Sequence, residues 1–173
     1  DVLRGNPVEK AILEVAGELG VSLNAKSLRA NRTDYLAFTS ENRFAAGLSP
    51  YETYNRLSVN GAPEYVIEHS NRVLDNGRVT ELSDEKRKQL HRDIERQSSE
   101  GKRLIAVAYN EVNYDAIPED DPDEVLTGLV LVGVVVLNDP VRDGVKEAIS
   151  GVKGAGAEVL LITGDNPKTA LSI

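Results

Sequence analysis

Two polar clusters directly follow apolar runs, and their side chains are of kinds that handle anions. Residues 138–142 read Asn-Asp-Pro-Val-Arg and follow the apolar run 126–137. Residues 163–167 read Thr-Gly-Asp-Asn-Pro and follow the run 158–162. In an open α/β sheet, ligands are held beyond the carboxyl ends of neighbouring parallel strands. If both runs are such strands, the two clusters line one crevice.

The residue types in these clusters favour phosphate. Arg142 can meet phosphate oxygens in a fork, and Gly164 lets a ligand approach the backbone. A helix beginning at Asn166 would turn its N-terminal amides toward an anion. The further polar residues of this edge are Asp139, Thr163 and Asp165. Asp139 and Asn166 could alternatively be plain helix caps. The P-loop pattern is absent, and no nucleophile stands out.

The elements that would position these clusters form a strand–helix–strand unit. The run 126–137 is continuously apolar, as in a strand buried on both faces. Residues 141–157 predict a helix, and 158–162 predict a second buried strand. The apolar face of that helix holds Val145, Ala148, Ile149 and Val152. The last 48 residues, 126–173, therefore predict a partial Rossmann-like βαβ unit with a right-handed crossover.

Residues 1–125 have a different texture and predict a mixed α+β region. Pro7 begins a helix over 6–20, and Pro63 begins another after a strand that starts near residue 54. The other predicted elements are strand–turn–strand over 34–48, a Ser83-capped helix within 78–101, a strand over 102–112 and an acidic loop over 117–125. We interpret that loop as a solvated connection rather than a metal site, because closely packed carboxylates repel one another without a cation.

Composition limits the possible partners. The 173 residues carry a formal charge of −8, which disfavours duplex nucleic acid and anionic membrane surfaces as partners. Cysteine is absent, and neither His69 nor His91 stands in a metal-ligand spacing, so we expect no metal site. No apolar run reaches 18 residues. The chain begins at Asp1 without a methionine and stops inside a predicted helix, so we expect a piece of a longer protein.

At this point the motifs resemble a known family. Asp-Pro-Val-Arg followed by TGDNPKTA resembles the phosphorylation domain of P-type cation-transporting ATPases. Four earlier segments resemble that family in the same order: GNPVEKAIL, FTSENR, NGAPE and GKRLIAVAY. The resemblance implies that residues 1–125 are the nucleotide-binding domain, an antiparallel sheet flanked by helices. Residues 126–173 would then be the hinge and the incomplete N-terminal part of the haloacid-dehalogenase-like phosphorylation domain.

The resemblance also implies a function. The parent would use ATP and Mg²⁺ to form an aspartyl phosphate that drives cation transport, with this chain at the cytoplasmic face of the membrane. The family's phosphorylated aspartate and Mg-binding motifs are not in the chain, so it should bind ATP without hydrolysing it. Its partners would be the remaining phosphorylation, actuator and transmembrane domains. The residues supporting the phosphoryl site would be Asp139, Arg142, Thr163, Gly164 and Asp165.

The resemblance also implies a nucleotide pocket in residues 1–125. Phe38 would stack on adenine, Glu9 would contact its edge, and Arg43 would meet phosphate. Arg103 would bridge nucleotide and domain. The remaining pocket residues would be Asn60, Gly61 and Ala62. Without the family, Phe38 is an ordinary core aromatic. Asn60 stands where the family usually has Lys, which predicts weaker binding.

Two alternatives stay open. A haloacid-dehalogenase-type phosphohydrolase would have similar strand ends, but it needs an Asp-x-Asp nucleophile and does not explain the earlier motifs. A non-catalytic interaction module with a vestigial pocket is favoured by Asn60 and by Val8, which replaces a family threonine. The motif set looks most like the calcium-pump-like branch. Calcium is therefore the expected ion, with magnesium, sodium/potassium and proton as rivals.

Overall fold

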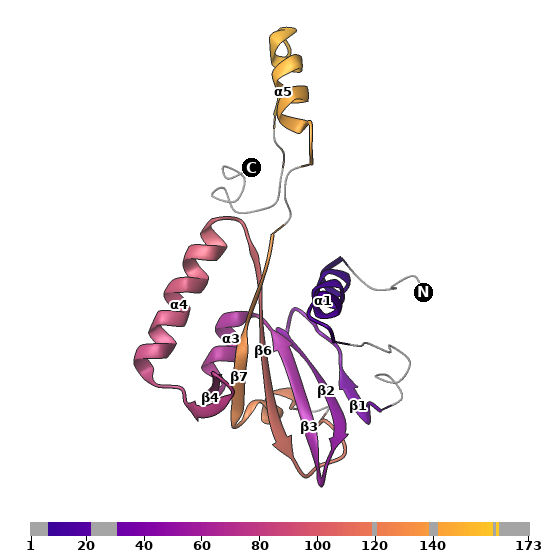
Figure 1. Ribbon diagram of the computed structural model, residues 1–173, viewed down its shortest axis with the longest axis vertical. Helices are drawn as coiled ribbons and strands as arrows, with labels where there is room; N and C mark the ends of the chain where they lie inside the picture. The colour runs from indigo at the N-terminus through magenta and orange to yellow at the C-terminus, as the bar shows by residue number, and fades with distance from the viewer. Residues whose placement is uncertain (1–6, 22–30, 119–120, 139–141, 161, 163–173) are drawn as a thin grey trace. The chain divides into compact units, whose positions relative to one another are not determined.

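A computed structural model describes residues 7–21, 31–118, 121–138, 142–160 and 162. The chain divides into two compact units, Asp1–Ser83 with Ile105–Val134, and Asp84–Leu104 with Val135–Ile173. The elements, of which all but β5 and η1 are labelled in Figure 1, are α1 (Pro7–Glu18), β1 (Asp34–Leu36), β2 (Phe44–Tyr51), β3 (Tyr54–Gly61), α3 (Pro63–Glu68), β4 (Ser70–Asp75), β5 (Arg78–Glu81), α4 (Asp84–Ser99), β6 (Arg103–Val112), the 3-10 helix η1 (Pro122–Leu126), β7 (Leu129–Leu137) and α5 (Val145–Gly154).

Seven strands form one sheet in the order β1-β2-β3-β6-β7-β4-β5. The pairs β1–β2, β2–β3, β3–β6 and β4–β5 are antiparallel, whereas β4 and β7 pair in parallel. The predicted mixed α/β class is confirmed.

The hairpin of β2 and β3 shows how the sequence builds this sheet. Leu48 lies opposite Leu57 and Ala46 opposite Val59, and all four side chains are buried. The alternate residues Ser58 and Asn60 are exposed on the other face. Burying each large aliphatic side chain stabilises the fold by about 1.5–3 kcal/mol. The two-residue period therefore separates a core face from an opposite, open face, on which Ser58 and Asn60 are exposed and Ala45 is buried.

Helix α3 covers part of the core face. Pro63 occupies its first turn, where the missing N–H costs no hydrogen bond. Val66 and Ile67 are buried, and the helix contacts β3 and β4. The Ser70 hydroxyl, which is also buried, donates to the carbonyl of Val66 at 2.7 Å. The junction between β3 and α3 is therefore fixed on the core side.

The second unit holds α4 and α5. Ile94 is the buried residue of α4, and Lys102 closes the end of that helix. The Lys102 ammonium donates to Gln97 Oε1 at 2.8 Å and pairs with Glu100 at 2.6 Å. Helix α5 has no buried residue, and the apolar face predicted for it includes Ile149 and Val152, both exposed. Among the described helices, none has the length and apolarity needed to cross a membrane.

Two features of the predicted βαβ unit differ in the structure. Strand β7 does not start a separate sheet, because it lies between β6 and β4. Only its first three residues, 129–131, are buried. The second strand predicted over 158–162 is not seen in its described residues, since 158–160 and 162 lie outside any strand. A buried strand needs pairing and cover, and here Leu160 is 80% exposed and Ile162 93% exposed.

Strands β4 and β5 were not predicted. Their alternation is weak because polar and charged residues interrupt it, and all four residues of β5 are exposed. The Asn76-Gly77 turn between them is nevertheless a strong hairpin signal, since both residues adopt positive φ. Attention to that dipeptide would have found the hairpin.

Candidate functional site

A tight turn follows Phe38 and ends at Arg43. The Thr39 hydroxyl accepts the N–H of Asn42 at 3.0 Å, and the Thr39 carbonyl accepts the N–H of Arg43 at 2.9 Å. Phe38 stands just before this turn, and its side chain is 57% exposed. Phe38 is therefore not the core aromatic that the sequence predicts when the family resemblance is set aside. An aromatic ring left open beside a rigid turn is available for stacking.

The turn is joined to the start of α3 by a close backbone approach. Gly61 lies opposite Phe44, and the N–H of Ala62 donates to the carbonyl of Arg43 at 2.9 Å. A Cβ added at Gly61 would stand 2.5 Å from that carbonyl oxygen and 2.8 Å from the Cα of Phe44. Only glycine permits this spacing. The structure thus brings two motifs, FTSENR and NGAPE, into direct contact.

The Arg43 side chain lies on an aromatic ring. Its guanidinium carbon is 4.4 Å from the centroid of the Tyr65 ring, within the range of a cation–π contact. Tyr65 in turn stacks with Phe44 at a centroid distance of 6.2 Å and meets the His69 ring at 4.5 Å. Arg43 itself has φ of 60°, which is rare for a residue other than glycine and is often found at functional sites.

The side chain of Tyr65 is partly buried, and its backbone carbonyl has a partner as well. Burial, and then a hydrogen bond from its hydroxyl to the Asp123 carboxylate, raise the pKa of Tyr65 to about 12. The hydroxyl therefore stays protonated at neutral pH. The imidazole Nδ1 of His69 lies 2.8 Å from the carbonyl of Tyr65. Both the ring and the backbone of Tyr65 are thus fixed.

Asn60 is placed on the open face of the sheet. It lies between Ala45 of β2 and Val107 of β6, directly before Gly61, and its side chain is exposed. Four predicted pocket residues therefore lie together at the open end of the β2–β3 hairpin, away from its turn: Arg43, Asn60, Gly61 and Ala62.

Apart from Phe38, the remaining predicted residues lie in the second unit or have side chains outside the described residues. Glu9 lies in α1, but its side chain is outside the described residues, as are Asp139, Thr163, Gly164 and Asp165. Arg103 begins β6 and Arg142 precedes α5; both are exposed, and both belong to the second unit. The Arg142 carbonyl accepts the N–H of Val145 at 3.3 Å.

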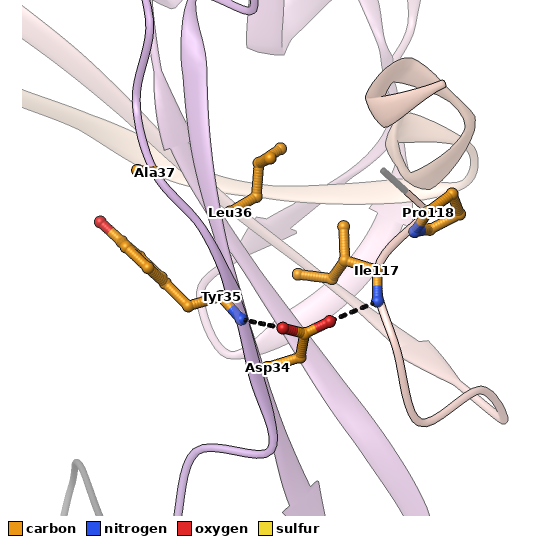
Figure 2. Close-up of a pocket in the computed structure, with 6 residues that line it drawn as sticks. All are labelled: Asp34, Tyr35, Leu36, Ala37, Ile117 and Pro118. Carbon is orange, nitrogen blue, oxygen red and sulfur yellow. Dashed lines mark hydrogen bonds between the residues drawn. The ribbon is translucent and has the colours of Figure 1, made fainter. Parts of the chain in front are cut away.

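A hollow of about 230 Å³ lies elsewhere, beside the edge strand β1 (Figure 2). Its lining residues are Asp34, Tyr35, Leu36, Ala37, Ile117 and Pro118. The two carboxylate oxygens of Asp34 accept the N–H groups of Tyr35 and Ile117, each at 2.7 Å. These bonds lower the pKa of Asp34, the Ile117 bond most strongly. Because the carboxylate is already satisfied, we interpret the hollow as a joint between β1 and the segment near residue 117.

Phe38, Arg43 and the Asn60–Ala62 segment have the chemistry of a recognition site. An exposed aromatic ring fits a flat base, and a guanidinium fits phosphate oxygens. Sequence reasoning missed Tyr65, His69 and Asp123. Tyr65 stands only two residues after Pro63, and aromatics make up 5% of the chain, so its rarity was an available signal.

Comparison with known families agrees with this geometry. The family model of the P-type ATPase cytoplasmic domain N matches residues 2–144. The match includes the turn after Phe38, the Gly61 junction and Tyr65. The chain belongs to the P-type ATPase cytoplasmic domain N family.

Individual relatives are similar over most of the chain. Calcium-transporting ATPase 1 of Lactococcus lactis is 28% identical over 99% of this chain. Plasma membrane calcium-transporting ATPase 4 of Bos taurus is 38% identical over 68% of it. The sodium/potassium-transporting ATPase subunit alpha-1 of Oreochromis mossambicus is 28% identical over 98%. The matched segments span 19%, 10% and 18% of these relatives' own lengths.

Proposed function

We propose that this chain binds the adenine nucleotide for a P-type cation-transporting ATPase. The observation that carries the proposal is the hydrogen bond from the Ala62 N–H to the Arg43 carbonyl. It joins the turn after Phe38, whose ring is exposed, to the Asn60–Ala62 segment. Family membership over residues 2–144 supports it.

Each residue has a distinct part in the proposed pocket. Phe38 stacks on adenine, a contact worth around 1–3 kcal/mol by analogy with nucleobases on protein aromatics. Arg43 presents its N–H fork to phosphate oxygens. The floor of the pocket is formed by Asn60, Gly61 and Ala62. There Asn60 offers a hydrogen bond in place of the positive charge of the family's usual lysine. Glu9 contacts the adenine edge, and Arg103 bridges nucleotide and domain.

The parent protein would complete the reaction. Bound ATP and Mg²⁺ supply the phosphoryl group and its charge neutralisation for an aspartyl phosphate in the phosphorylation domain. Asp139, Arg142, Thr163, Gly164 and Asp165 would support that phosphoryl site. Residues 126–173 would be the hinge and the first part of that domain, working with the actuator and transmembrane domains at the cytoplasmic membrane face. The relatives that are calcium-transporting ATPases favour calcium as the transported ion.

An NMR titration of this chain with ATP and with AMP-PNP tests the proposal. We expect saturable shifts of the Phe38, Asn60 and Arg103 amides, lost in Phe38→Ala. The matched control is Tyr35→Ala, which removes a ring that is 47% exposed on β1 and leaves Phe38 in place. We expect the control to bind ATP as the unaltered chain does.

Two results would contradict the proposal. No shifts at several millimolar ATP would favour a vestigial pocket, and equal loss in both aromatic variants would mean that stacking on Phe38 is not specific. Calcium is tested separately by ATP-driven ⁴⁵Ca uptake into vesicles that carry the full-length protein, with magnesium, sodium and potassium as competing ions.

A further inference from the structure

We infer that Tyr65 is a positioning residue, which holds the Arg43 guanidinium in place to receive the phosphates of the bound nucleotide. The inference rests on the proposed function, since it concerns how Arg43 is presented in that pocket.

The first argument is that Arg43 is fixed at both its backbone and its side chain. Its N–H donates to Thr39, and its carbonyl accepts from Ala62, both at 2.9 Å. Its guanidinium lies 4.4 Å from the Tyr65 ring centroid. A long flexible side chain normally loses rotamer freedom when it binds a ligand. Here that ordering has already taken place, which favours binding through preorganisation.

The second argument is that stacking and phosphate binding use different parts of the guanidinium. The Arg43 guanidinium carbon lies over the Tyr65 ring, which attracts the cation through its π-electrons rather than through an acceptor atom. The five N–H donors point outward in its plane, where they can form a fork with phosphate oxygens. Among the described residues, no carboxylate forms an ion pair with Arg43. Tyr65 therefore holds the cation without occupying its donors.

The third argument is that Tyr65 is built into the fold as a rigid platform. Phe44 and His69 hold its ring from neighbouring positions. A lysine at position 43 would be a point charge without a flat face, so this pairing suits arginine.

A double-mutant cycle tests the inference. Affinities for ATP and for adenosine are measured by calorimetry for the unaltered chain, Tyr65→Leu, Arg43→Gln and the double variant. We expect Tyr65→Leu to weaken ATP binding about two- to fivefold and to leave adenosine binding unchanged. In the Arg43→Gln background it should cause no further loss. The conservative Tyr65→Phe keeps the ring and should retain at least half of the ATP affinity.

A second readout needs no variant and no nucleotide. The Tyr65 ring current should shift the side-chain Hδ and Hε resonances of Arg43 upfield from their random-coil positions. This measurement keeps the inference testable even if Tyr65→Leu does not fold.

The possible outcomes distinguish failure of the proposed function from failure of the positioning role of Tyr65. If the unaltered chain does not bind ATP, the proposed function fails, and this inference fails with it. If it binds ATP but Tyr65→Leu binds ATP equally well or more tightly, only the positioning role is overturned. Arg43 resonances at random-coil positions would also overturn that role alone.

Discussion

At the residue scale, Gly61 has no room for a side chain, because backbone atoms of Arg43 and Phe44 occupy the space that a Cβ would need. We predict that Gly61→Ala destabilises the fold by about 1–3 kcal/mol, the usual cost of overpacking. Urea unfolding followed by circular dichroism measures this change. The matched control is Gly133→Ala in β7, where nothing lies within 4 Å of an added Cβ. Equal stabilities of the two variants would contradict the predicted clash.

The turn between β2 and β3 contains a residue under backbone strain. Glu52 has φ of 52° at the two-residue connection between Tyr51 and Tyr54. We predict that Glu52→Gly stabilises the fold by about 0.5–1 kcal/mol, because relief of left-handed strain exceeds the added entropy of glycine. Urea midpoints measure it. Glu52→Gln removes the charge and keeps the strain, so it should change stability by less than about 0.5 kcal/mol.

At the scale of elements, Asp34 ties the edge strand β1 to the segment that contains Ile117 (Figure 2). Its pKa is lowered below the ordinary value of 3.8, so its contribution is complete above that value and is lost as the pH falls through the lower folded pKa. We predict that Asp34→Asn is less stable than the unaltered chain at pH 6. Asparagine keeps one acceptor oxygen and loses the other.

The pH dependence supplies the control for this prediction. The stability difference between the unaltered chain and Asp34→Asn should shrink as the pH falls from 6 to below 3.8, as measured by urea unfolding at each pH. A difference that stays constant over this range would mean that the carboxylate charge does not hold the joint.

Helices α3 and α5 make contrasting predictions about local stability. Helix α5 has ten residues and none buried, whereas α3 has six and buries Pro63, Val66 and Ile67. Helices of such length are marginal without tertiary packing. We predict that the α5 amides exchange with deuterium faster than those of the shorter α3, as measured by NMR. Slower exchange in α5 would show that packing is not what stabilises these helices.

At the scale of the whole molecule, the buried residues are concentrated in the sheet. Backbone amides in the buried strands should therefore exchange with deuterium most slowly. Leu57 and Val59 of β3 are buried and lie between β2 and β6, so they should be among the slowest to exchange. The formal charge of −8 means that an anion is repelled by the chain as a whole and attracted only by local cations. In the proposed function, Arg43 is such a cation.

The sequence alone determined the elements with strong local signals and the family. Proline positions and the period of apolar residues predicted the helix beginning at Pro7, the strands within 34–48, the strand that starts near residue 54 and the helix beginning at Pro63. The family motifs identified Phe38, Arg43 and Asn60 as pocket candidates. Their roles in nucleotide binding stay predictions.

Only the tertiary structure decided which of these residues meet. The place of β7 between β6 and β4 depends on long-range pairing, which no local period encodes. Tyr65 reaches Arg43 because Gly61 pairs with Phe44 and allows the backbone to approach within a distance that a Cβ would forbid. A contact between residues 22 positions apart in the chain results from strand register and chain packing. That is why sequence reasoning found Arg43 and missed the ring beneath it.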